Sequence, residues 1–243
     1  MPGKTGERQT PQRPWKLDRV SVLFRVRDFA CEISRAWFRA RGECGKLHSG
    51  MTANTASSGR LTIELPEWLA ETAAENPGPL ATDEARMALT IRLSRENVLR
   101  GGGPFGGTVF LGDQLVASGV NLVLSSGFSI AHAEIVALMA AQAALGGGAL
   151  NLPPLTLYAS TEPCCQCFGS LVWAGVRRLV CGATTADAEA VGFDEGPKPD
   201  AWVKVLEQRG ITVAQGVLQA EARQVLDDYV ARGGQIYGKP VTA

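Results

Sequence analysis

The 243-residue sequence predicts an α/β protein, built as a three-layer α/β/α sandwich around a mixed sheet. Two observations carry this prediction. A β-hairpin pattern comes first, and helical and strand patterns then alternate to the end of the chain, which favours parallel strands added to an antiparallel pair. With 45% hydrophobic residues, the chain is also long enough to bury a substantial core.

The first half of the predicted domain contains one helix and the hairpin. Thr82 is placed to cap a helix that has acidic residues in its first turn and ends at the glycines 101–103. Residues 107–121 form two β-rich runs around the polar turn 112–114, which is the pattern of a hairpin. Before them, residues 65–80 predict only a short helical or irregular lead-in.

Helices and strands alternate in the second half. Residues 131–145 are apolar nearly all round, so we expect a buried helix that ends at the glycines 146–148. The remaining elements are predicted as strand 155–160, helix 167–176, strand 177–184, helix 200–210, strand 211–217 and helix 220–234.

Charge is divided unevenly, although the formal net charge is zero. Residues 1–50 carry 11 Lys and Arg against 5 Asp and Glu, whereas residues 51–243 carry 13 against 19. The basic leader can be a nucleic-acid arm or a transit peptide, or can lie outside the working protein if Met51 is the start. The acidic body disfavours a polyanionic partner. We therefore predict a leader at 1–50, a linker and lead-in at 51–80, and the domain at 81–243.

Nothing in the sequence indicates export or a membrane span. No apolar run approaches the ~20 residues needed to cross a bilayer, and the first residues lack the apolar segment of a secretory signal. We expect a cytoplasmic protein whose six cysteines are thiols or metal ligands rather than disulfides.

Three cysteines are crowded into the segment Cys164, Cys165 and Cys167, directly after a predicted strand. Pro163 marks the start of the next helix. Because residues three apart share a helical face, Cys164 and Cys167 can converge on one point. Cys165 lies about 100° around the helix and should face elsewhere. On this pattern alone, the pair is either redox-active or metal-binding.

His132 and Glu134 favour the metal. His132 opens the apolar helix, and the only other histidine is His48 in the leader. Burying a glutamate at the start of such a helix is costly unless it has a partner or a purpose. One His and two Cys leave a fourth tetrahedral position for water, as in catalytic zinc sites, and the glutamate could accept a proton from that water. Since positions two apart point about 200° apart, the metal must lie beyond the N-terminal end of the helix.

Each piece also has an ordinary explanation. A lone histidine beside an apolar helix is usually a satisfied buried residue, and a lone Cys-x-x-Cys is as often redox-active or incidental as metal-binding. A structural zinc would need a fourth protein ligand, and Cys181 lies in an apolar strand where packing is the simpler role. The two segments 132–134 and 163–167, each opening a helix, are much more specific together than either alone.

Together these segments resemble the signature of the zinc-dependent deaminases. The chain resembles the cytidine-deaminase-like superfamily from about Met87 to Tyr237. This resemblance implies a five-stranded mixed sheet between helices and a bound Zn²⁺. It also implies a hydrolytic deamination in which Glu134 shuttles protons. The implied zinc ligands are His132, Cys164 and Cys167.

Within that superfamily the sequence is most similar to the guanine deaminases. The similarity rests on residues 173–197, which contain "GFDE", and on the "GPFG" turn at 103–106. It implies that Asn121 hydrogen-bonds the base and that the backbone N–H of Ala133 contacts an exocyclic oxygen. It also implies that Glu195 is a second proton shuttle or accepts a hydrogen bond from the amino group. Asp194 could fill that role instead.

The resemblance also implies a homodimer, in which the segment around Tyr237 can be exchanged between subunits. It does not extend to residues 1–80, and the loop before His132 lacks the family's usual threonine. Two aromatic residues have simpler explanations. Phe105 could stack on a base, but we expect it to fill the core, and we expect Trp173 to pack along a buried helix or contact a second subunit.

The sequence therefore predicts a zinc-dependent hydrolase that acts on a small-molecule nucleobase and converts guanine to xanthine and ammonia. A buried carboxylate would favour guanine over adenine, because an unpaired buried partner costs roughly 1–3 kcal/mol. The alternatives are a deaminase of cytosine, an aminotriazine, a nucleoside or adenosine in tRNA, a non-catalytic zinc-binding scaffold, and a thiol oxidoreductase that uses the cysteine pair.

Overall fold

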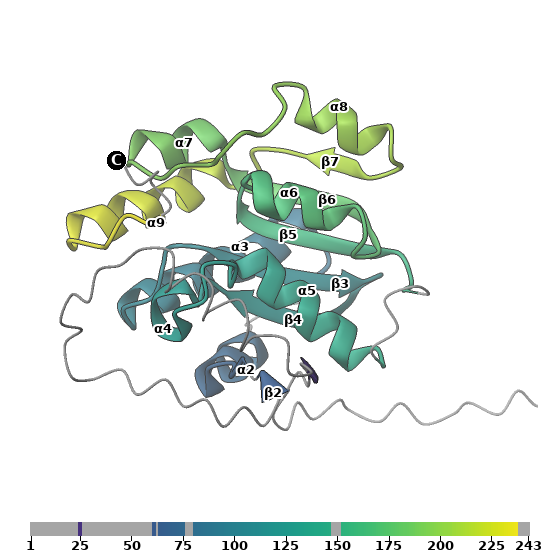
Figure 1. Ribbon diagram of the computed structural model, residues 1–243, viewed down its shortest axis with the longest axis horizontal. Coiled ribbons are helices and arrows are strands. Elements are labelled where there is room, and N and C mark those ends of the chain that lie inside the picture. The colour runs from purple at the N-terminus through teal and green to yellow at the C-terminus, as the bar shows by residue number, and fades with distance from the viewer. Residues whose placement is uncertain (1–23, 26–59, 62, 76–79, 147–151, 238–243) are drawn as a thin grey trace, which may run out of the picture.

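A five-stranded mixed sheet with helices on both faces forms the centre of the computed structural model (Figure 1). The structure describes residues 24–25, 60–61, 63–75, 80–146 and 152–237. Both the mixed sheet and the three layers confirm the predicted fold class. The strands are β3 (Gly106–Leu111), β4 (Gln114–Val120), β5 (Leu155–Thr161), β6 (Val176–Ala183) and β7 (Thr212–Ala214).

The strand order is β4-β3-β5-β6-β7. The predicted hairpin is present, since β3 and β4 pair antiparallel and Leu111 lies opposite Gln114 across the turn. Strand β3 is also antiparallel to β5, whereas β5, β6 and β7 are parallel to one another. The carboxyl ends of the three parallel strands therefore meet at one edge, where α/β proteins place their ligand sites.

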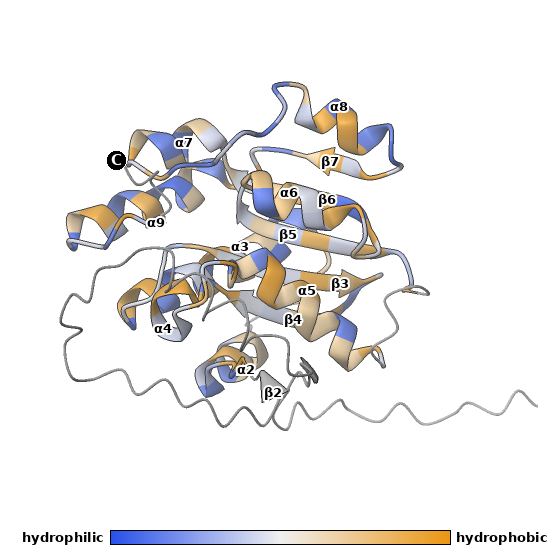
Figure 2. Ribbon diagram, in the orientation of Figure 1, coloured by the Kyte–Doolittle hydropathy of each residue, from blue (hydrophilic) through white to orange (hydrophobic). Residues whose placement is uncertain are grey.

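The helices form two layers. On one face, α5 (Ala133–Ala144), α6 (Cys165–Leu171) and α8 (Trp202–Glu207) share an apolar core with the sheet. On the other face, α3 (Asp83–Leu99) and α9 (Gln219–Ala231) do the same. Figure 2 shows α5 in pale to strong orange along most of its length, whereas α9 mixes orange and blue. This agrees with a buried α5 and an α9 that has one face in solvent.

Helix boundaries follow their capping residues. The hydroxyl of Thr82 accepts a hydrogen bond from the Ala85 N–H at the start of α3, as predicted. The lead-in forms a short helix, α2 (Glu67–Ala74). Instead of the helix predicted at 167–176, the structure has a shorter helix that starts two residues earlier and ends at Leu171. Turn residues 172–175 then lead into β6.

Two short helices were not predicted. The first is α4 (Val123–Ser126), a single turn after β4. The second is α7 (Thr185–Ala190), after β6. Thr184 and Asp187 form a capping box at its start, a pattern that the sequence contains.

A close contact places α5 on the sheet. Gly119 of β4 faces the start of the helix, and a Cβ atom there would lie 2.6 Å from the carbonyl oxygen of Ala133. Gly107 of β3 faces the same carbonyl, with 3.2 Å available to a Cβ. Only glycine at position 119 allows this approach, so the sheet fixes the position of the first turn of α5.

Several sequence predictions fall where little or nothing is described. The leader at 1–50 lies outside the described residues, except for β1 (Phe24–Arg25), which pairs antiparallel with β2 (Arg60–Leu61). The linker at 51–80 is described only in part. Among the described residues, no helix has the length and apolar character that crossing a membrane requires.

An ion pair joins the start of α3 to the sheet. The carboxylate of Asp83 accepts hydrogen bonds from Arg178 Nη1 and from the Tyr158 hydroxyl, both at 2.7 Å. Mainly through its hydrogen bond with Arg178, and against the opposing effect of burial, the pKa of Asp83 falls to about 2. A carboxyl whose folded-state pKa is depressed stabilises the fold above its unfolded pKa and loses that contribution as the pH falls.

Asp83→Asn should therefore lower the free energy of unfolding at pH 7 by on the order of 1 kcal/mol, since the pair is partly screened by solvent. The difference from the wild type should narrow as the pH falls below about 4, where the wild-type carboxylate begins to lose its advantage. Urea unfolding between pH 3 and pH 7 measures both quantities. Asp113→Asn is the control, because Asp113 pairs with Arg86 but is 96% exposed, and it should change little. A difference that does not vary with pH would contradict the assignment to this charge.

Candidate active site

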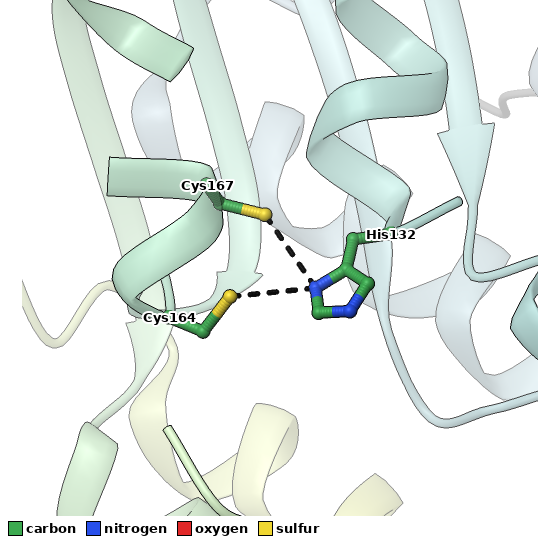
Figure 3. A group of neighbouring side chains, drawn as sticks. All are labelled: His132, Cys164 and Cys167. Carbon is green, nitrogen blue, oxygen red and sulfur yellow. Dashed lines mark hydrogen bonds between the residues drawn. The ribbon is translucent and has the colours of Figure 1, made fainter. Parts of the chain in front are cut away.

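The predicted ligand residues converge between α5 and α6. The sulfurs of Cys164 and Cys167 lie 3.4 and 3.6 Å from Nδ1 of His132 (Figure 3). The three side chains form a group whose potential ligand atoms all lie within 4.8 Å of one another. Cys165 does not belong to this group. The structure therefore brings together the three residues that the sequence singled out.

The backbone explains how the three side chains meet. His132 and Cys164 are each the residue before a helix, with extended backbone, and neither side chain caps its own helix. Each side chain therefore lies at the N-terminal end of its own helix, and the metal was expected beyond the end of the helix that His132 opens. Cys164 is not on the helical face that the sequence predicted, and Pro163 lies one residue ahead of it, outside α6. The pair meets because a residue at the N-cap reaches toward the third helical position.

The donor set fits zinc. Zinc takes cysteine sulfur at about 2.3 Å and histidine nitrogen at about 2.0–2.1 Å in a tetrahedron, which separates the two kinds of ligand by roughly 3.6 Å. The observed sulfur–nitrogen distances of 3.4 and 3.6 Å match this separation. Among the described residues the group has three protein ligands, the number that is typical of catalytic rather than structural zinc. Cys181, the other candidate ligand, is fully buried in β6 and belongs to the core, as predicted.

Electrostatics prepares the group for a cation. A hydrogen bond from the Cys167 thiol, helped by one from His132 and opposed by burial, lowers the pKa of Cys164 to about 4. Burial lowers the pKa of His132, but its hydrogen bond with Cys164 and the negative charges nearby raise that pKa overall. The hydrogen bond with Cys164, followed by burial, raises the pKa of Cys167, so Cys164 supplies the one thiolate charge that a divalent cation would stabilise.

A pocket opens beside the ligands at the carboxyl edge of the sheet. Its empty volume is about 450 Å³ with the solvent at its mouth included, so the enclosed space is smaller than this. Four acidic residues line it: Glu134, Glu162, Asp194 and Glu195. Their environments differ, and these differences separate their chemical roles.

Glu134 lies in the first turn of α5 and is 8% exposed. Burial, followed by the negative charge of Cys164, raises its pKa. His132 lines the same pocket, so both side chains reach one space beyond the helix end. A buried carboxyl with a raised pKa beside a metal-binding group is suited to accept and return a proton.

Glu195 is the buried member of the pair that the sequence left open. It is 6% exposed, whereas Asp194 is exposed and accepts a hydrogen bond from the N–H of Gly196. Burial, followed by the charges of Cys164 and Glu134, raises the pKa of Glu195 to about 8. No described residue donates a hydrogen bond to its carboxylate, which leaves that group available to a ligand.

Asn121 is both a turn residue and a pocket residue. Its Oδ1 accepts a hydrogen bond from the N–H of Val123 at 3.1 Å, while its backbone carbonyl accepts one from Asn97 Nδ2 at 2.9 Å. Among the described residues no acceptor bonds to the amide NH₂ of Asn121, which is one of the residues that line the pocket. Ala133 does not line the pocket, but it is the first residue of α5, so its N–H has no partner within the helix.

Aromatic side chains form the apolar wall. Phe105 and Phe193 meet edge to face with ring centroids 4.9 Å apart, and Tyr237 packs on Phe193 at 5.4 Å. Phe105 was expected to fill the core, and it does pack against the core cluster, but it is half-buried and also lines the pocket. Trp173 was expected to pack along a buried helix or to contact a second subunit. It lies in the turn after α6 and is 77% exposed within this chain, so the first role is wrong and the second stays a prediction.

The sequence did not single out Glu162 or Phe193. Glu162 directly precedes Pro163 at the end of β5, and a glutamate between an apolar strand and a cysteine helix is a signal of the same kind as Glu134. Phe193 lies within the "GFDE" segment that carried the family resemblance, but nothing local marks its ring as a pocket wall.

The family comparison places residues 80–183 in the cytidine and deoxycytidylate deaminase zinc-binding region. A guanine deaminase of Bacillus subtilis is 36% identical over 113 residues, which cover 46% of this chain and 71% of that protein. A solved guanine deaminase from Nitrosomonas europaea is 46% identical with a TM-score of 0.66, over 70% of this chain and 96% of that one. A tRNA-specific adenosine deaminase of B. subtilis is 33% identical over 43% of this chain and 63% of its own length.

The ligand geometry predicts the metal content of three cysteine variants. Cys164→Ala and Cys167→Ala should each lose most bound zinc, because the site would keep only two of its three protein ligands. Cys165→Ala is the matched control, since it removes a neighbouring thiol that lies outside the group. It should keep one zinc ion per chain. Metal analysis of the purified variants measures this, and loss of zinc from Cys165→Ala would mean that the wrong pair was assigned.

Proposed function

The chain belongs to the cytidine-deaminase-like family of zinc-dependent aminohydrolases, and we propose that its substrate is the free base guanine, which it converts to xanthine and ammonia. The observation that carries this proposal is the buried Glu195 carboxylate, which faces the pocket with no described residue bonded to it. With a pKa raised to about 8, this carboxyl can hold a proton at neutral pH, and in its ionised form it accepts hydrogen bonds from a ligand. Guanine offers it a ring N–H beside an amino group.

In this proposal, His132, Cys164 and Cys167 hold the metal. Bound zinc polarises water so that it becomes a nucleophile near neutral pH. Glu134 takes the proton that the attacking water gives up and delivers it to the amino nitrogen, which leaves as ammonia when its bond to the ring carbon breaks. Water thus supplies the oxygen of xanthine.

Groups around the pocket bind the base. Glu195 accepts hydrogen bonds from the base, and its raised pKa of about 8 also suits it to hold a proton during the reaction. The free amide NH₂ of Asn121 donates to an acceptor on the ring edge. The unpaired N–H of Ala133 donates to the exocyclic oxygen. Phe105 and Phe193 supply the apolar wall.

Adenosine in tRNA is the second candidate, because tRNA deaminases are among the relatives. Two observations favour a free base instead. Tyr237 lines the pocket from the end of the described chain, and its hydroxyl is buried, as expected of a pocket closed around a small ligand. The body of the chain is also acidic. Homodimerisation and exchange of the Tyr237 segment remain predictions. Within the single chain described, Tyr237 lines the chain's own pocket.

A substrate panel tests the proposal. Zinc-loaded protein should release ammonia from guanine with a kcat/KM at least about tenfold above that for cytosine, adenine or an aminotriazine, since one lost buried hydrogen bond costs that much or more. Guanosine keeps the hydrogen-bonding edge of guanine, so its rate tests whether the pocket admits a ribose. An enzyme-coupled ammonia assay measures all five reactions in parallel. A preference for cytosine or adenine would contradict the assignment of the pocket, and turnover that survives removal of zinc by a chelator would contradict the metal mechanism.

Glu134→Gln should keep zinc and lose about 10²- to 10⁴-fold in kcat, because an amide of the same size cannot move the proton. Steady-state kinetics with guanine, alongside metal analysis, separate the two effects. Glu189→Gln makes the same change at an exposed position on α7 and should have near wild-type activity. Near-normal turnover in Glu134→Gln would exclude this carboxylate as the proton carrier.

A further inference from the structure

A buried network joins the ends of three parallel strands beside the pocket. Glu162, just after β5, is 6% exposed. Its Oε2 accepts hydrogen bonds from the N–H and the hydroxyl of Thr185 at 2.9 and 2.8 Å, and its Oε1 accepts one from Gln215 Nε2. Thr185 follows β6 and Gln215 follows β7. Unlike the carboxylate of Glu195, the carboxylate of Glu162 is therefore occupied by the protein itself.

Lys198 completes this network. Its Nζ donates hydrogen bonds of 2.7 Å to the Thr185 hydroxyl and to the carbonyl oxygen of Pro163. The Thr185 hydroxyl accepts from the lysine and donates to Glu162, so the ammonium charge and the buried carboxylate are linked through one oxygen. The Nζ atom also lies 4.7 Å from the centre of the Trp202 ring. Three contacts thus fix a side chain that does not line the pocket.

The lysine lies on the segment that carries Glu195. We call residues 193–198 the Glu195 loop. The segment 163–167, which we call the cysteine turn, contacts this loop at a second point, where the N–H of Cys165 donates to the carbonyl oxygen of Glu195 at 2.9 Å. Gly196 packs on the sulfur of Cys165, and a Cβ there would lie 2.5 Å from that sulfur. The loop is therefore held against the cysteine turn by one backbone hydrogen bond and by the Lys198 side chain.

We propose that Lys198 is a positioning residue that holds the Glu195 loop against the cysteine turn and thereby aims the Glu195 carboxylate into the pocket. It acts through Pro163 and Thr185, and it touches neither the substrate nor the metal ligands. A hydrogen bond from an ammonium group is stronger than one between neutral groups, so this contact contributes more to holding the loop than the backbone bond at Cys165 does. The link to Glu195 chemistry rests on the proposed function, whereas the holding of the loop does not.

Hydrogen–deuterium exchange on the zinc-loaded full chain tests the holding of the loop. In Lys198→Met, which keeps the apolar stem over Trp202, the amides of Cys165 and Lys198 should exchange roughly tenfold faster or more, because the loop opens more often. Core amides of α9 should not change. Lys204→Met is the matched control, since Lys204 is exposed on α8, and it should leave loop exchange unaltered.

A second variant guards against a general loss of structure. Thr185→Val removes the oxygen between Lys198 and Glu162 but keeps the lysine, and it should speed exchange at the same amides. Unchanged exchange in both variants would overturn the proposal. Equal acceleration throughout the protein would also overturn it, because the effect would then be general destabilisation.

Kinetics test the link to Glu195. Lys198→Met should lower kcat/KM for guanine by roughly tenfold. In a Glu195→Gln background, the same change should have an effect of no more than about twofold, because the loop then has no carboxylate to position. Independent, multiplying effects would overturn the positioning role. If the wild type does not act on guanine while Lys198→Met still speeds loop exchange, the proposed function fails and the holding of the loop stands.

Discussion

The close approach of α5 to strands β3 and β4 is the contact on which the site depends. Gly119 lets the carbonyl of Ala133 lie where a side chain would otherwise stand, and His132 and Glu134 flank that residue. The helix therefore cannot shift along the sheet without moving both groups away from the cysteine turn. Because protein interiors are close-packed, such a contact defines a position rather than a range of positions.

The second organising feature is the edge where three parallel strands end. The chain leaves β5 into the cysteine turn and leaves β6 into α7, so residues distant in sequence meet without any long connection. Three buried glutamates gather there, and their surroundings divide them. Glu162 is used to join strand ends, while Glu134 and Glu195 keep carboxylates that face the pocket. Burial raises the pKa of the last two, and a bound dication would offset part of that cost.

Much of the fold could be predicted because many of its elements depend on short sequence patterns. The hairpin turn, the Thr82 cap and the apolar helix before Gly146 depend on neighbours along the chain, and each was found close to its predicted place. The errors have local causes as well. Helix α7 was missed although Thr184 and Asp187 form its capping box. Helix α6 was predicted too long, because the apolar residues after it belong to a turn that packs on the core and not to the helix.

By itself, the sequence determined which residues can bind one metal ion, because His132 and the cysteine pair, each at the start of a helix, already formed one candidate ligand set. Only the tertiary structure decided what surrounds that set. It distinguished buried Glu195 from exposed Asp194, placed Phe105 between the core and the pocket, and joined Lys198 to the cysteine turn. These outcomes depend on contacts between segments that are far apart in the chain, and the burial of a side chain is a property of all its neighbours in space rather than of those beside it in sequence.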